Sequence, residues 1–388
     1  SLTLGGFLGI TNGWILANCH FRGIKILKIC QLIPFATPAY LLAATLIDLG
    51  SIHAMRITGL FWGVIVMAFT TYPYVFLLSS ENFEKAGRKQ IEACRTLGVG
   101  PWKSFFRISL PIAIPSITAG LALMAMEIIN ELGAVQLLNI PSISAGIMEI
   151  WVEEGEPSGA ITLALFALIL VFLLVAIERQ SRERSKRWSD GISVGDSPKW
   201  KLKGIYLLLA KVIALAPPIF TLGIPITWAI INIEQINQGF NTDLIGLTIR
   251  SFSLAILVSL ITVFIALILS ASKRWQNNKL LNTFTFLSSI GYAIPGSVLA
   301  IALISFKGSF WQINVLSLLI WGYTIRFIAV SKGGLDAGFE RIKPSIDNSA
   351  VSLGKSWPKV LFKIHLPLLK GPILVGSLLV FVDTIKEL

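Results

Sequence analysis

Long stretches with few or no charged residues recur along this sequence, and they constrain the fold more than any other feature. A helix needs about 20 predominantly apolar residues to cross a bilayer, and ten stretches approach or exceed that length. They are Ser1 to Cys19, Ile29 to Ile47, Ile57 to Ser80, Ile112 to Leu138, Gly159 to Ile177, Gly204 to Ile233, Leu244 to Ser272, Leu280 to Phe306, Ser309 to Ser331 and Leu368 to Leu388. Only 14% of the residues are charged and 54% are hydrophobic, whereas an ordinary soluble globule has about 25% charged residues. The sequence therefore predicts an all-α polytopic membrane protein.

The formal net charge of +12 is concentrated in alternate loops between these stretches. One set of loops holds 26 of the 33 Lys and Arg residues, and its members are 20–28, 81–111, 178–203, 273–279 and 332–367. The opposite set holds only Arg56 and Lys307. Because cytoplasmic loops of membrane proteins carry such an excess of Lys and Arg, we expect the basic loops to face the cytoplasm of a bacterial inner membrane. Topology accounts for the charge, and no nucleic-acid partner is expected.

The second half of the chain repeats the first at a nearly constant offset. Glu92 to Gly98 returns 256 residues later as Asn348 to Gly354, in a weaker copy. Pro38 to Ile47 matches Pro295 to Ile304 at an offset of 257, with five of ten residues identical. A third block, which ends in Glu-Leu in both copies, again has the offset of 256. Six spans separate equivalent points, so both copies have the same orientation, which predicts two tandem parallel-repeat membrane domains.

The repeat divides the chain into a first domain (1–177), a basic cytoplasmic linker (178–203) and a second domain (204–388). The basic run of the linker is expected to anchor the topology, and binding of anionic membrane lipid is the alternative. A complete duplication would place one further span before the first residue and one after the last. We therefore expect a fragment of a protein with twelve spans, in which each domain lacks a terminal span.

The two repeated basic loops share one local pattern. Small residues precede a glycine, Gly98 or Gly354, and a further helical stretch then leads to Pro111 or Pro367. Glycine permits a positive φ and proline stops a helix, so each loop is predicted to form a helix-turn-helix. Either copy alone is compatible with an ordinary cytosolic loop. Their repetition on one membrane face favours a docking surface for a soluble partner.

The spacing of these loops resembles the EAA loop of bacterial ABC importer permeases: Glu-Ala-Ala, three residues, Gly, nine residues and Ile-x-Leu-Pro. The first copy departs from it at Cys94, and the second departs at Asn348 and Ser349. The resemblance implies a type I importer permease, in which each loop is a coupling helix seated in a groove of an ATPase subunit. The residues that it assigns to the coupling loops are Glu92, Ala93, Gly98, Leu110, Pro111, Ala350, Gly354, Leu366 and Pro367.

Further strings resemble the fused, two-domain permeases of iron(III) ABC importers over almost the whole chain. They are Pro38 to Tyr40, Tyr72 to Leu78, Arg326 to Val330 and, as the most specific, Phe381 to Leu388. This resemblance implies two cytosolic ABC ATPase subunits, which would hold ATP and Mg, and a periplasmic solute-binding protein. No cofactor is expected on this chain. A thiamine or other small-solute ABC permease is the runner-up, and a secondary transporter is the alternative from another class.

Charged residues also lie inside the fourth and tenth apolar stretches, where an ionisable group is costly unless it is paired or wetted. They are Glu127, Glu131, Asp383, Lys386 and Glu387. The acids are spaced i,i+4, so each pair shares a helix face and would suit a translocation pathway or gate for a cation. The alternative is a helix-packing network, in which Lys386 neutralises Asp383 in the second copy and Asn130 is the polar partner in the first. Arg326, in the ninth stretch, is expected to extend to the cytosolic interface.

The sequence offers no catalytic residues and no ATP site of its own. Gly354-Lys355-Ser356 resembles the end of a P-loop, but Ser349 stands in place of the first glycine of that motif. The three histidines lack the spacing of metal ligands, and the three cysteines form no paired framework. We therefore assign no metal site, expect no enzyme activity, and expect the ATPase to be a separate chain.

Overall fold

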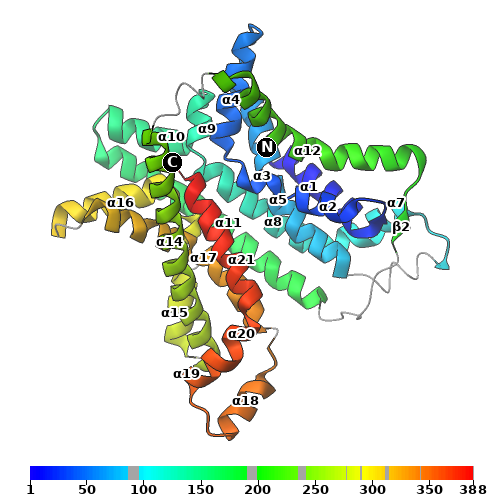
Figure 1. The fold of residues 1–388 in the computed structure, drawn as a ribbon, viewed down its shortest axis with the longest axis vertical. Helices are drawn as coiled ribbons and strands as arrows, with labels where there is room; N and C mark the ends of the chain where they lie inside the picture. Colours follow the sequence, from blue (N-terminus) through cyan, green and yellow to red (C-terminus); the bar gives the residue numbers. More distant parts are fainter. Residues whose placement is uncertain are drawn as a thin grey trace. The chain divides into compact units, whose positions relative to one another are not determined.

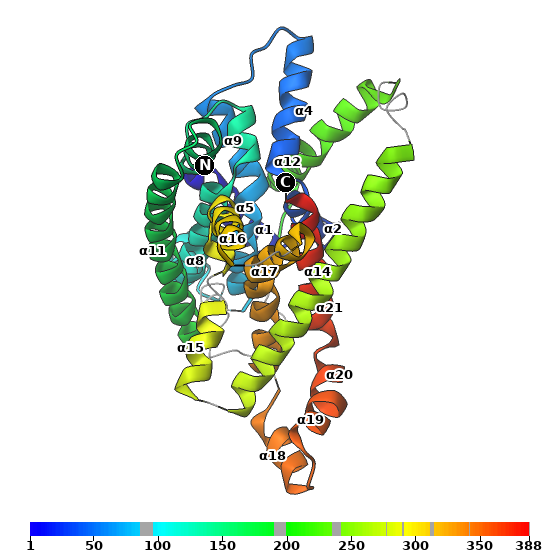
Figure 2. The same ribbon diagram turned by 90° about the vertical axis from the view of Figure 1, so that its left-hand side faces the viewer.

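The computed structural model describes the chain except for residues 86–95, 190–198, 235–241, 277, 289–290, 311–313, 341 and 388. The described residues are almost entirely helical, as the apolar stretches predict (Figures 1 and 2). They form two compact units, which we call unit 1 (Ser1–Asn237) and unit 2 (Gln238–Leu388).

Unit 1 begins with a long helix and a short strand, and it ends with the long helix α12. Its elements are α1 (Leu2–Asn18), β1 (Cys19–His20), α2 (Ile24–Cys30), α3 (Ile33–Ala36), α4 (Ala39–Ile52), α5 (Leu60–Lys85), α7 (Pro101–Ser104), the π-helical η1 (Phe105–Ser109), α8 (Leu110–Asn130), α9 (Gly133–Leu137), α10 (Ile143–Met148), the π-helical η2 (Glu149–Glu153), α11 (Pro157–Ser189), β2 (Trp200–Lys201) and α12 (Gly204–Ile231). β1 and β2 pair in parallel, with Cys19 opposite Trp200. This two-residue pairing is the one sheet in the described part of unit 1.

Unit 2 contains helices alone among its described elements. They are α14 (Thr242–Trp275), α15 (Lys279–Ser288), the 3₁₀-helical η3 (Gly291–Ala293), α16 (Gly296–Phe310), α17 (Val315–Glu340), α18 (Pro344–Ser352), α19 (Trp357–Val360), the π-helical η4 (Leu361–His365), α20 (Leu366–Leu368) and α21 (Lys370–Lys386).

Each unit is built around three helices packed together: α1, α5 and α8 in unit 1, and α14, α17 and α21 in unit 2. The members of the two trios correspond at the offset of 256 residues. Small residues bring the helices close, since a Cβ on Gly120 would lie 2.8 Å from the Cα of Val75. A Cβ on the equivalent Gly376 would lie 3.1 Å from the Oγ of Ser331. Close packing of small residues is how helices associate in lipid, so the tandem repeat of the sequence is also a repeat of packing.

Proline residues break two of the ten expected spans. The second span is divided into α2–α3 and α4, which diverge by 85° where Pro38 precedes α4. Pro34 lies at the start of α3 and Pro38 caps α4, so both prolines flank this bend. The eighth span, expected as one helix from Leu280 to Phe306, is instead divided into α15, η3 and α16, with Pro295 just before α16. Proline removes a backbone donor and clashes with the preceding turn, so it favours a kink or a break in a helix.

The number of straight spans is therefore smaller than the ten expected. Within the described residues, six helices are long and apolar enough to cross a membrane, or eight if each bent pair counts as one span. The fourth expected span also divides, because α8 ends at Asn130 and α9 begins at Gly133. The apolar run of the sequence continues through this turn, which is why it was predicted as one helix.

Helix α12 packs in unit 1, against α4 and α3, although the repeat assigns it to the second domain. Pro218 has no N–H, so the carbonyl of Ala214 loses its helical donor. The Gln31 Nε2 group donates to that carbonyl at 2.6 Å, and the Tyr72 hydroxyl donates to Gln31 Oε1 at 3.0 Å. Units 1 and 2 thus describe packing, whereas the domains predicted at 1–177 and 204–388 describe the repeat. The predicted linker begins as helix, because α11 continues to Ser189.

Candidate functional site

The second repeated loop forms a helical hairpin (residues 344–367) at one end of unit 2, where α18 and α19 lie beyond the ends of α17 and α21 (Figures 1 and 2). The turn after α18 places Gly354 at a φ of +71°. The Gly354 N–H donates to the Val351 carbonyl at 2.9 Å, and the Lys355 N–H donates to the Ala350 carbonyl at 3.1 Å. These two bonds define a Schellman motif, which closes a helix on a left-handed residue. No atom lies within 4 Å of the Cβ position of Gly354, so the backbone angle is what requires glycine.

The first hairpin (residues 96–111 in its described part) repeats this turn. Gly98 has the same φ of +71° and the same open space around its Cβ position. The short helix and π-helical turn of α7 and η1 recur as α19 and η4 at the offset of 256. Glu92 and Ala93, which the EAA resemblance assigns to this loop, lie outside the described residues. The predicted helix-turn-helix is thus present in the second loop, and the first loop shares its turn and its second helix.

The prolines of the two loops do not stop a helix, contrary to expectation. Leu110 and Pro111 begin α8 directly after η1, and Leu366 and Pro367 begin α20 directly after η4. A π-helical turn bonds residue i to residue i+5, and this wider turn accommodates the missing N–H of proline while the chain remains helical. The first hairpin therefore continues as a helix directly into α8. In unit 2 a break at Leu369 separates α20 from α21.

A tryptophan pair joins each hairpin to the first helix of its trio. The rings of Trp14 in α1 and Trp102 in α7 stack with centroids 5.6 Å apart, and those of Trp275 in α14 and Trp357 in α19 stack at 5.2 Å. The interplanar angle is 28° in both pairs. Both hairpins are therefore packed onto the membrane helices by aromatic surfaces, which contribute area and a defined geometry.

Apolar side chains are exposed at equivalent positions of the two hairpins. Leu97 and Leu353, each one residue before the left-handed glycine, are 79% and 76% exposed. Phe106 and Phe362, in the two π-helical turns, are 61% and 66% exposed. Because the charge pattern predicts that these loops face the cytoplasm, apolar groups exposed at matched positions make both hairpins candidates for a protein contact.

The intramembrane charges of unit 2 form two ion pairs. Lys386 Nζ lies 3.0 Å from Asp383 Oδ1, as the packing alternative expects. Arg326 Nη2 lies 3.0 Å from Glu387 Oε1, and the Arg326 side chain is only 11% exposed. The expectation that Arg326 extends to the cytosolic interface is therefore wrong. Its partner Glu387 follows the last residue of α21. The Arg326 guanidinium lies directly against Gly296 of α16.

The equivalent positions of unit 1 keep the acids but not the bases. Glu127 and Glu131 correspond to Asp383 and Glu387, whereas Thr70 and Asn130 replace Arg326 and Lys386. Glu131 directly follows α8 with extended backbone, and its Oε1 accepts a hydrogen bond from the Ala134 N–H at 3.0 Å at the start of α9. The ion pairs of unit 2 favour packing there. A pathway or gate role for the five charged residues stays a prediction.

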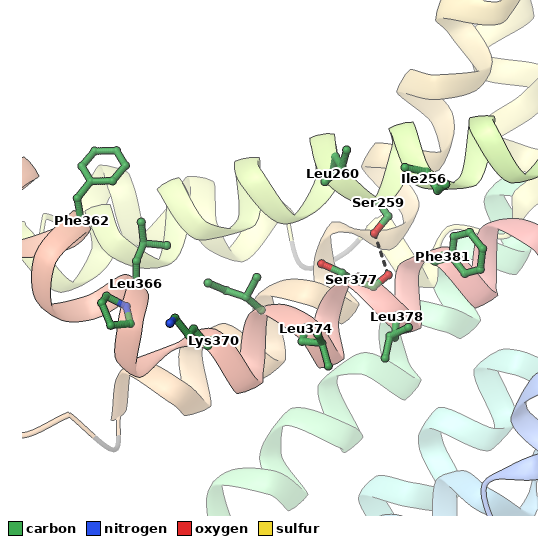
Figure 3. Close-up of a pocket in the computed structure, with 12 residues that line it drawn as sticks. Ile256, Ser259, Leu260, Phe362, Leu366, Lys370, Leu374, Ser377, Leu378 and Phe381 are labelled. Atoms are coloured by element: carbon green, nitrogen blue, oxygen red, sulfur yellow. Dashed lines mark hydrogen bonds between the residues drawn. The ribbon is translucent and has the colours of Figure 1, made fainter.

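A groove of about 850 Å³ lies between α14 and the α20–α21 segment of unit 2 (Figure 3). Its lining is apolar apart from Ser259, Ser377 and Lys370. The Ser259 hydroxyl donates to the Ser377 carbonyl at 2.8 Å and is therefore already engaged. An ion that leaves water needs several oxygen or nitrogen ligands in replacement, and this lining provides too few of them. We do not count the groove as a solute site.

Sequence reasoning missed a polar cluster beneath the second hairpin, formed by Arg274, Asp347 and His365. Asp347 Oδ2 accepts from Arg274 Nε at 2.6 Å, and Asp347 Oδ1 lies 2.7 Å from His365 Nε2. The signal available in the sequence was weak, because the three residues are separated by up to 91 positions and Asp347 lies just before the EAA-like segment. The described part of the chain contains no group of three His, Cys, Asp or Glu side chains that could hold a metal ion.

The repeated hairpins and trios agree with a comparison to known protein families. Residues 9–180 and 263–388 match the family described as the inner membrane component of binding-protein-dependent transport systems. The chain belongs to this family. It is a transport permease and a multi-pass protein of the bacterial inner membrane, with one family segment in each repeat.

Individual relatives of the permease transport different solutes. The chain is 24% identical to the Fe(3+)-transport system permease protein FbpB 2 of Haemophilus influenzae, over 100% of this chain and 77% of that protein. It is 33% identical to the sulfate transport system permease protein CysT of Escherichia coli, over 34% of this chain and 51% of that protein. It is 31% identical to the molybdenum transport system permease protein ModB of Escherichia coli, over 46% of this chain and 88% of that protein.

Proposed function

We propose that this permease imports its solute at the expense of ATP, with one cytosolic ATPase subunit docked on each hairpin. The observation that carries the proposal is the repeated exposure of Leu97 and Leu353 beside the left-handed turns. Burying an exposed leucine side chain in a groove on a partner would contribute about 1.5–3 kcal/mol to the free energy of binding. Equal exposure at equivalent positions suits two copies of one partner. In this proposal ATP and Mg bind the ATPase subunits, and this chain holds no cofactor.

We propose iron(III) as the solute, delivered by a periplasmic solute-binding protein. The similarity to the Fe(3+) permease covers both repeats and 100% of the chain, whereas the similarities to the sulfate and molybdenum permeases cover 34% and 46% of it. An oxyanion is the second candidate, because those shorter matches have the higher identity. Thiamine and other small solutes are further outcomes that the experiment below separates.

The experiment reconstitutes the permease with its ATPase subunits in proteoliposomes and measures ATP hydrolysis and uptake. Binding proteins loaded with Fe(3+), sulfate, molybdate or thiamine are added in turn. We expect stimulation of hydrolysis by the Fe(3+)-loaded protein and no stimulation by the others. Stimulation by a sulfate- or molybdate-loaded protein alone would indicate that the solute is an oxyanion and not iron(III). Uptake that follows a proton gradient without any ATPase subunit would identify a secondary transporter and refute the proposal.

A further inference from the structure

One guanidinium ties together three elements beneath the second hairpin. Arg274, at the end of α14, donates through Nη1 to the Phe339 carbonyl at 2.6 Å and through Nη2 to the Ile342 carbonyl at 2.9 Å. Its Nε donates to Asp347 of α18. The first carbonyl belongs to the last turn of α17, where the helix dipole is negative and favours a cation. Arg274 thus links the ends of two trio helices to the hairpin.

Asp347 extends this link to the second half of the hairpin. Its other carboxylate oxygen lies 2.7 Å from Nε2 of His365 in η4, and the His365 side chain is fully buried. The imidazole packs edge-on against the rings of Phe339 and Trp357, with centroids 5.3 and 5.2 Å away. The side chains of Arg274 and Asp347 are 14% and 15% exposed, so the ion pair is largely shielded from solvent screening.

The first hairpin lacks these groups. The positions equivalent to Arg274, Asp347 and His365 are Asn18, Ile91 and Ser109, of which none carries a charge. Both hairpins have the tryptophan stack, whereas the charged residues at these three positions occur only in the second copy. That copy is also the one in which Asn348 and Ser349 replace the Glu and Ala of the EAA pattern.

We propose that Asp347 is a positioning residue that clamps the second hairpin to α14 and α17, so that force from a docked ATPase subunit reaches those helices. The inference rests on the proposed function, because it assumes a partner on the hairpin. Asp347 is the one residue of the cluster that bonds both Arg274 and His365, and its removal leaves a buried guanidinium without its carboxylate. A carboxylate with two fixed partners also restricts α18 to one orientation, which an apolar contact of the same area would not do.

The test uses Asp347→Asn, Arg274→Gln and the double variant in the reconstituted complex. Asp336→Asn is the matched control, because Asp336 pairs at 3.0 Å with Lys332, which lies four residues away in the same helix α17. For Asp347→Asn we expect at least about a tenfold loss of uptake per ATP hydrolysed, with the ATPase subunits still co-purifying. The control should couple as the wild type does. Because the cluster acts as a unit, the double variant should lose no more coupling than Asp347→Asn alone.

The outcomes separate the inference from the proposed function. A wild-type complex that neither retains ATPase subunits nor hydrolyses ATP in response to solute refutes the proposed function, and the inference with it. A wild type that couples, together with an Asp347→Asn variant that couples equally, refutes the inference alone. Additive losses in the double variant also refute it, because they indicate separate structural roles. If Asp347→Asn does not reach the membrane, His365→Gln takes its place, and unchanged coupling by that variant counts against the clamp.

Discussion

Substitutions of Gly354 test whether the left-handed turn defines the second hairpin. A residue with a Cβ costs about 1–2 kcal/mol at a positive φ. Abandoning the turn would lose the two Schellman hydrogen bonds, each of which contributes about 1 kcal/mol. Alanine should therefore keep the turn under strain, because its cost does not exceed the loss of both hydrogen bonds. Valine is β-branched and costs more, so in Gly354→Val the turn should open and the ATPase subunit should dissociate. Asparagine, which tolerates this region, should lie between glycine and alanine.

Hydrogen exchange of the peptide 344–367 measures this local opening, because exchange reports the free energy of opening region by region. A cost of 1–2 kcal/mol corresponds to about 5- to 30-fold faster exchange in Gly354→Ala. Gly333→Ala is the control: Gly333 lies inside α17 and no atom is within 4 Å of its Cβ position. Alanine is favoured over glycine by about 1 kcal/mol in a helix, so this variant should slow exchange nearby. Unchanged or slower exchange in Gly354→Ala would refute the reasoning.

Three further predictions concern other contacts. Leu353→Ser should weaken ATPase co-purification by about tenfold without lowering the melting temperature, since it removes exposed apolar area; retention of the subunit at wild-type levels in a pull-down would contradict it. Gln31→Leu should destabilise unit 1 by about 1–3 kcal/mol, because the Ala214 carbonyl loses its donor, and thermal unfolding in detergent would detect this loss. Arg326→Gln should destabilise unit 2 by up to about 3–5 kcal/mol, and adding Glu387→Gln should restore part of it. A double variant less stable than Arg326→Gln would exclude a buried ion pair as the cause.

Much of this fold follows from patterns that one sequence contains. Apolar length and the offset of 256 residues predicted the helices and the tandem repeat, and the placement of Lys and Arg predicts which loops face the cytoplasm. Gly98 and Gly354 predicted the two left-handed turns, because few residues other than glycine adopt that angle. Such features are local, or they depend on periods that can be counted along the chain.

Contacts between distant residues could not be predicted in this way. Arg326 was assigned to the interface because its sequence neighbourhood does not reveal Glu387, which approaches only when α17 packs against α21. The clamp of Asp347 depends on a helix end 73 residues away in sequence. The breaks after Asn130 and before Pro295 were missed because hydropathy continues across them, although the helix does not.

The docking of α12 in unit 1 has a consequence for chains that divide the two repeats into separate polypeptides. A cut between Ser189 and Lys199 would follow the boundary of the repeat, and α12 would then be the first helix of the second polypeptide. Its bond from Gln31 and its apolar contacts with α3 and α4 would persist as contacts between subunits. Gene fission at this point would thus produce a heterodimer in which the existing contacts of α12 form the interface between the two subunits.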